Sequence, residues 1–138
     1  MQNPDSVQGW LQLVRQHETA ALALVDSKTA AAQAYFHVGM AVECALKAYI
    51  MRKERWNAWP SKEAREDLYT HDLRLLKQMA GIDVKQTDTT APAWHVMLQA
   101  DRQQNYNPKP MPRKVARSLF DAAFCDEGVV TWIRQKLG

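Results

Sequence analysis

Glycine and proline are scarce in this sequence, with five and six residues among 138. Most of them stand between segments whose apolar residues recur at helical spacing, and strand signals are nearly absent. No apolar run approaches the roughly 18 residues that indicate a membrane span, and no N-terminal segment combines a basic start with an apolar stretch. We therefore expect a helical protein of the cytoplasm that does not enter a membrane.

Cysteine is also rare, since only Cys44 and Cys125 occur and they lie far apart in the chain. Cys44 falls inside a helical pattern, which is typical of a small buried hydrophobic residue in a reducing compartment. The histidines show no HxxxH, CxxC or HExxH spacing, and no GxGxxG or GxxxxGK loop is present. These absences disfavour a zinc site and ordinary ATPase or dinucleotide chemistry, so we expect no metal and no cofactor.

Apolar periodicity and capping residues predict helices over 6–25, 29–54, 72–79 and 91–104, and a last helical stretch that begins near 112. A break is expected at 126–128, and a short helix around 61–68 in the connection that precedes the third helix. In the first and last of these stretches, Leu22 and Val115 belong to the expected apolar faces. The fold class is therefore predicted as all-α, an up-and-down bundle of about five helices in one domain over 1–138.

The helix over 29–54 is expected to be the spine of the bundle. Its inward stripe is rich in alanine, which allows close helix packing, and consists of Ala34, Val38, Ala41, Ala45, Leu46 and Tyr49. On the same helix Glu43 and Lys47 are four residues apart and are expected to form a partly exposed salt bridge. His37 is interpreted either as a hydrogen-bonded core histidine or as an interface residue.

Positive charge is concentrated near the end of the chain, although the net charge is only +3. Five basic residues fall within 102–117 without an acidic neighbour: Arg102, Lys109, Arg113, Lys114 and Arg117. Arg102 lies where the fourth helix is expected to end, close to Tyr106 and Asn107. An arginine there suits a bidentate bond to phosphate, and equally suits capping the helix C-terminus.

Several segments together resemble the HEPN domain family. The second helix has the pattern of Ala41, Glu43, Leu46, Lys47 and Ala48; Thr70 to Leu73 reads THDL; and Trp94, Arg102 and Tyr106 follow before a late Val-x-x-Ile. HEPN domains are small helical bundles of bacterial toxin–antitoxin pairs, nucleotidyltransferase partners and defence systems. The resemblance implies a two-fold homodimer with sites along the shared cleft, to which Trp56, Trp59 and Met111 could contribute, unless they close the ends of the bundle.

Many HEPN proteins are metal-independent ribonucleases that use an Arg, four to six further residues, and a His. Here Asn107 follows Arg102 after four residues, and an amide cannot transfer protons at neutral pH. We therefore expect a non-catalytic module that binds a nucleotide, an RNA or a partner protein such as a nucleotidyltransferase or antitoxin. The residues expected to bind are Arg102, Tyr106, Asn107, Arg113, Lys114, Glu43 and Lys47.

The alternative is a divergent, toxin-like endoribonuclease in which Arg102 is assisted by His71 or by His95. Arg65 and His71 also have a permitted spacing, which we interpret as coincidence because they precede the third helix. His71 is expected to cap that helix or to pack beside the second one. A helical scaffold without a ligand is the third interpretation.

Overall fold

The computed structural model describes residues 3–138, and these residues are helical without any strand. The elements are α1 (Val7–Leu24), α2 (Ala31–Glu54), the 3-10 segment η1 (Glu66–Leu68), α3 (Leu73–Ala80), α4 (Ala91–Leu98), the 3-10 segment η2 (Arg102–Tyr106), α5 (Arg113–Phe124) and α6 (Val129–Leu137). The expected all-α bundle is confirmed, with the last helical stretch divided into α5 and α6.

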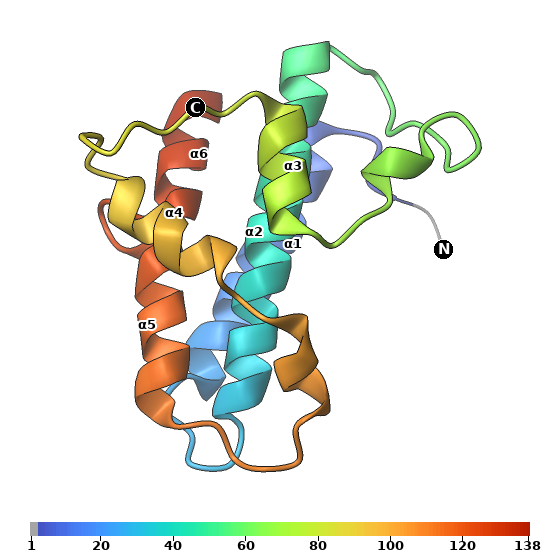
Figure 1. Ribbon diagram of the computed structural model, residues 1–138. Helices are drawn as coiled ribbons and strands as arrows, with labels where there is room; N and C mark the ends of the chain where they lie inside the picture. The colour runs from blue at the N-terminus through green and yellow to red at the C-terminus, as the bar shows by residue number, and fades with distance from the viewer. Residues whose placement is uncertain (1–2) are drawn as a thin grey trace.

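The hairpin of α1 and α2 forms the centre of the bundle (Figure 1). The Ser6 side chain accepts a hydrogen bond from the backbone N–H of Gly9 and so caps α1. Between the two helices, the Ser27 hydroxyl accepts bonds from the backbone N–H groups of Thr29 and Ala30. The cap fixes the start of α1 and the Ser27 bonds order the connection, while α2 begins at Ala31 without a side-chain cap.

The other helices surround α2, which justifies its description as a spine. Helices α5 and α6 follow one another along one side, α3 lies beside the C-terminal half of α2, and α4 crosses in front (Figure 1). Every residue of α2 from Ala41 to Ala48 is buried, so this stretch has no solvent-facing side. Most of the predicted inward stripe is confirmed, although Tyr49 is only half-buried and stacks on Trp132 at a centroid distance of 5.9 Å.

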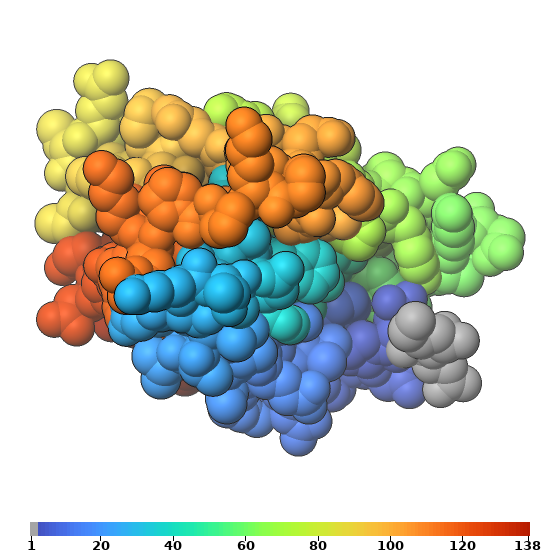
Figure 2. Space-filling view, turned by 90° about the horizontal axis from the view of Figure 1, so that it is seen from below, coloured from blue at the N-terminus to red at the C-terminus, as the bar shows by residue number. Residues whose placement is uncertain are grey.

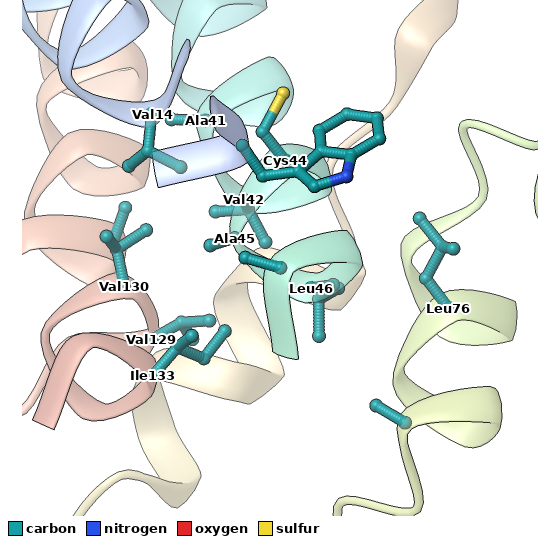
Figure 3. Close-up of a cluster of buried hydrophobic side chains, with 14 of the residues drawn as sticks. Val14, Ala41, Val42, Cys44, Ala45, Leu46, Leu76, Val129, Val130 and Ile133 are labelled. Atoms are coloured by element: carbon teal, nitrogen blue, oxygen red, sulfur yellow. The ribbon is translucent and has the colours of Figure 1, made fainter. Parts of the chain in front are cut away.

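The core is built from small and branched side chains that converge on α2 (Figure 3). Its labelled members come from α1, α2, α3 and α6: Val14, Ala41, Val42, Cys44, Ala45, Leu46, Leu76, Val129, Val130 and Ile133. Trp59 is also buried and packs edge-on against Trp10, and Met111 is buried against the other end of the hairpin. Both residues therefore close the bundle of a single chain.

Three details of the sequence prediction are wrong, and a fourth is confirmed in part. Helix α4 ends at Leu98 rather than near 104, because the chain is extended at Asp101, whose backbone N–H donates to the Tyr35 hydroxyl at 2.8 Å. The short helix expected around 61–68 is present only as the 3-10 segment η1, which follows a turn. Leu22 and Val115 are 59% and 40% exposed. They lie at the border of the apolar faces, where periodicity alone does not separate core from surface.

The break between α5 and α6 lies where it was predicted. Cys125 is extended, and Gly128 stands at the N-cap of α6. A Cβ atom at position 128 would lie 2.5 Å from the backbone oxygen of Ala123, so only glycine fits this turn without a shift. None of the helices in residues 3–138 combines the length and apolar character needed to cross a bilayer.

Candidate anion-binding cavity

A cavity lies between α2, the start of α3 and the segment that connects α4 to η2. It has a volume of about 530 Å³, within the usual range for small-molecule sites. Its walls are formed by Tyr35, Phe36, Gly39, Met40, Glu43, His71, Asp72, Leu73, Arg74, Leu98, Ala100, Asp101, Arg102 and Asn105. We call this space the main cavity.

One face of α2 forms the floor of the main cavity. Phe36, Gly39, Met40 and Glu43 are spaced at i, i+3, i+4 and i+7, which places them on a single stripe of the helix. Three of the four are apolar, and Gly39 leaves room because no atom lies within 4 Å of where its Cβ would be. The floor is therefore an apolar stripe that ends in one carboxylate.

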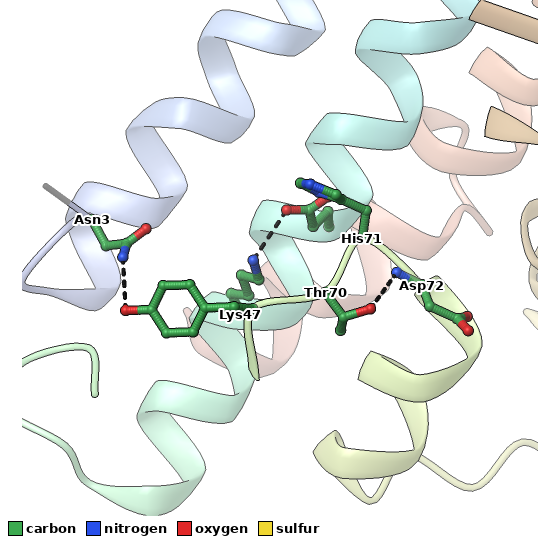
Figure 4. A network of polar contacts seen from close by, with 7 residues as sticks. Asn3, Lys47, Thr70, His71 and Asp72 are labelled. Atoms are coloured by element: carbon green, nitrogen blue, oxygen red, sulfur yellow. Dashed lines mark hydrogen bonds and ion pairs between the residues drawn. The ribbon is translucent and has the colours of Figure 1, made fainter. Parts of the chain in front are cut away.

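Glu43 joins Lys47 and His71, both labelled in Figure 4, into a polar network at the end of this floor. Its Oε1 lies 2.7 Å from His71 Nδ1, and its Oε2 accepts a hydrogen bond from Lys47 Nζ at 3.1 Å. The expected salt bridge is therefore present, but Glu43 and Lys47 are only 4% and 6% exposed, so its predicted partial exposure is wrong. The His71 side chain is 54% exposed and links the buried pair to the cavity.

Lys47 lies behind Glu43 and does not line the main cavity. Its ammonium group sits 5.5 Å from the ring centre of Trp10 and 6.0 Å from that of Trp59. Attraction between the cation and the two indole faces helps to offset the loss of hydration that burial costs. The structure therefore gives Lys47 a supporting position, where the sequence placed it at a binding groove.

Two arginines reach the rim of the main cavity from opposite sides. Arg74 projects from the first turn of α3 and Arg102 begins η2, and both residues are exposed. Within residues 3–138 neither guanidinium group donates a hydrogen bond to, or forms an ion pair with, another side chain. Arg102 does not cap α4, since that helix ends four residues earlier. Both groups are therefore free to bind a ligand.

Three carboxylates (Glu43, Asp72 and Asp101) and two guanidinium groups (Arg74 and Arg102) line the main cavity, so with His71 neutral its formal charge is −1. Asp72 caps α3 by accepting from the backbone N–H groups of Arg74 and Leu75, and Asp101 accepts from that of Gln103. These backbone dipoles favour the two aspartates, while Glu43 is paired with Lys47. The arginines are the cations of the cavity, and they keep their hydrogen-bond donors for a ligand.

The remaining predicted binding residues lie outside the main cavity. Tyr106 is 78% exposed, and Asn107 accepts a hydrogen bond from the backbone N–H of Lys109. Arg113 donates to the backbone oxygen of Asp26, whose carboxylate pairs with Arg117 at 2.8 Å. The basic segment thus does meet an acidic residue, because it folds against the connection between α1 and α2 (Figure 2).

Of the proposed histidine partners, His71 shares the main cavity with Arg102, whereas His95 does not line it and contacts Gln99 instead. Arg65 forms two hydrogen bonds to Asp67, so the structure gives it no shared role with His71. His71 packs beside α2, one of its two expected positions, and Asp72 provides the cap of α3.

Sequence reasoning missed Arg74 and the apolar floor. Arg74 comes three residues after His71, a spacing that already places both at the start of the third helix. Phe36 and Met40 lie outside the inward stripe of α2 but share a face with Glu43, and this second stripe was the available signal. Asn105 lines the main cavity in place of the predicted Asn107.

A separate polar contact joins α1 to α2, where His17 Nδ1 and His37 Nδ1 lie 2.9 Å apart. Burial lowers the pKa of His17, and the neighbouring His37 lowers it further, while Glu43 acts in the opposite direction. His37 is therefore a half-buried, hydrogen-bonded residue of the hairpin. No group of three or more metal-ligating side chains occurs among the residues the structure describes.

Comparison of the chain with protein-family models, curated proteins and solved structures gives no match. The function is therefore inferred from the geometry of the main cavity and from the sequence motifs.

Proposed function

We propose that the protein is a binding module whose main cavity holds a nucleotide or the end of an RNA chain. The observation that carries this proposal is the pair of unpaired guanidinium groups, Arg74 and Arg102, at the rim of a cavity with an apolar floor. Guanidinium groups bind phosphate through parallel hydrogen bonds, and Phe36 and Met40 offer a surface against which a base can pack. The apolar floor and the two cations match the two halves of such a ligand.

The test is a calorimetric titration of the protein with adenosine 5′-monophosphate at low salt. A hydrogen bond to a charged group contributes about 1.5–3 kcal/mol, so Arg102→Gln and Arg74→Gln should each weaken binding by about tenfold or more. Arg15→Gln removes an exposed charge from α1 outside the cavity and serves as the control. Equal affinity of the wild type and both cavity variants would refute the proposal.

The resemblance to HEPN domains supports further parts of this proposal. It favours a two-fold homodimer and a protein partner such as a nucleotidyltransferase or an antitoxin, in the bacterial cytoplasm. A mass measurement in solution tests the homodimer directly. Co-expression with the product of a neighbouring gene, followed by purification on a tag carried by this chain, tests the protein partner.

A metal-independent endoribonuclease is the second candidate, and one contact favours it. The Glu43 carboxylate lies 2.7 Å from His71 Nδ1, so when Nδ1 carries the proton, Nε2 is left as the nitrogen that can exchange a proton with a substrate. Arg102 would then hold the phosphate. This differs from the family arrangement, because the histidine precedes α3 rather than following Arg102.

Expression in cells separates the two candidates. An active ribonuclease should slow growth, and His71→Ala and Arg102→Ala should both relieve this effect while remaining folded by circular dichroism. Harmless expression of the wild type, together with intact RNA in a cleavage assay, would exclude the ribonuclease and leave the binding module.

A further inference from the structure

A second hollow adjoins the main cavity on the side of α5. It has a volume of about 270 Å³ and is lined by Tyr35, Val96, Gln99, Ala100, Lys114, Val115, Ser118 and Leu119. Tyr35 and Ala100 line the main cavity as well, so these two residues form the wall that the spaces share. We call this space the side hollow.

The position of the shared wall is fixed by the backbone. The Tyr35 hydroxyl accepts the hydrogen bond from the backbone N–H of Asp101 at 2.8 Å, which ties the chain after Ala100 to α2. Tyr35 and Ala100 are thus the residues that a ligand must pass to reach one space from the other.

The side hollow repeats the chemistry of the main cavity in simpler form. Val96, Val115 and Leu119 supply apolar surface, and Lys114 supplies one cation. No acidic residue lines it, and within residues 3–138 the Lys114 ammonium group has no hydrogen bond or ion pair. Val115, which was expected on an apolar helix face, is 40% exposed. Its exposed surface forms part of the wall of the side hollow.

We propose that the ligand is a single-stranded oligonucleotide of at least two nucleotides, with one base in the main cavity and the next in the side hollow. This inference depends on the proposed function of the main cavity. Apolar surface beside positive charge, present in two spaces that share Tyr35 and Ala100 as a wall, matches a ligand that itself alternates base and phosphate. A mononucleotide would leave the side hollow and Lys114 unused.

The test compares ligands of different length on the same protein. Adenosine 5′-monophosphate and a tetra-adenylate are titrated by calorimetry, in ribo and deoxyribo form for the longer ligand. The tetra-adenylate should bind about tenfold or more tightly than the mononucleotide. Lys114→Gln should remove most of this gain while leaving the mononucleotide affinity unchanged, and it should also reduce the salt dependence of oligonucleotide binding by about one phosphate contact.

Two further variants make the outcome specific to the side hollow. Ser118→Glu places a negative charge in its wall and should weaken the tetra-adenylate but not the mononucleotide. Lys62→Gln removes an exposed lysine that lines neither space and should change neither affinity.

The possible failures can be told apart. If the mononucleotide binds through Arg102 but length and Lys114→Gln have no effect, this inference is wrong and the proposed function stands. If the mononucleotide does not bind at all, both the proposed function and this inference are wrong. If Lys114→Gln weakens the binding of a hexaglutamate peptide as much as that of the tetra-adenylate, the side hollow recognises polyanions in general and the assignment to nucleic acid is overturned.

Discussion

Replacing Lys47 by methionine tests the buried network beneath the main cavity. Methionine is an apolar residue of similar length to lysine, so it fills the same space. The Glu43 carboxylate, which is 4% exposed, is then left without its cation. Breaking a buried pair from one side costs about 3–5 kcal/mol. His71 keeps its contact at 2.7 Å and is half exposed to solvent, so we expect the lower end, about 3 kcal/mol. For a domain whose total stability is about 5–15 kcal/mol, this is a large loss.

The decisive measurement is a double-mutant cycle with Glu43→Gln. Glutamine removes the buried, unpaired charge. The loss of unfolding free energy in the double variant should therefore be about 2 kcal/mol or more smaller than the sum of the losses in the two single variants. Urea unfolding followed by circular dichroism gives the four free energies of unfolding, those of the wild type, the two single variants and the double variant. Lys53→Met is the control, because Lys53 is on the same helix but 45% exposed, and it should cost less than about 1 kcal/mol. Additive costs at positions 43 and 47 would refute the account of a coupled buried pair.

Three other predictions concern stability and reactivity. The pKa of His17 is lowered in the fold, so the unfolded chain takes up a proton more readily and stability should fall as the pH drops below about 6.5. His17→Gln should reduce this slope in unfolding experiments at pH 5.5 and 7.5, and an unchanged slope would contradict the assignment. Gly128→Ala should cost about 1–3 kcal/mol, because the added Cβ meets a backbone oxygen at 2.5 Å, and a thermal melt with no shift would show that the turn adapts. Burial raises the pKa of Cys44 to about 12 whereas Cys125 is exposed, so a thiol reagent should modify one cysteine quickly in the folded protein and both after denaturation; two fast reactions would disprove this.

The helices that could be predicted well are those whose ends are set by neighbouring residues. Ser6 caps α1 and Asp72 caps α3, while Gly81 ends α3 with a φ of 69° that suits glycine. Each of these signals operates within one turn of the chain, so the sequence contains it in full. The break before α6 belongs to the same group, because Gly128 marks it locally.

The end of α4 was not predictable in this way. No residue between 98 and 104 is incompatible with a helix. The helix nevertheless stops at Leu98, shortly before the Asp101 backbone N–H bonds to Tyr35, 66 residues earlier in the chain. The contact between His71 and Glu43 likewise joins residues 28 positions apart. Arg102 was found by its motif, whereas its position beside the same cavity as Arg74 depends on how α3 packs against α2. The geometry of the site therefore depends on tertiary contacts, whereas local signals set the ends of most helices.

The burial of Glu43 and Lys47 shows why periodicity misjudged the spine. A helix surrounded on all sides has no polar face, so a charged pair at i and i+4 gives no sign of whether it faces water. In this bundle the pair is buried, and one oxygen of Glu43 reaches His71 at the cavity. A substitution at either residue therefore changes stability and site together. Arg74, Arg102 and Lys114 are exposed, and their side chains form no hydrogen bond or ion pair within residues 3–138. Their replacement therefore separates binding from folding, and it is at these three positions that the function can be tested cleanly.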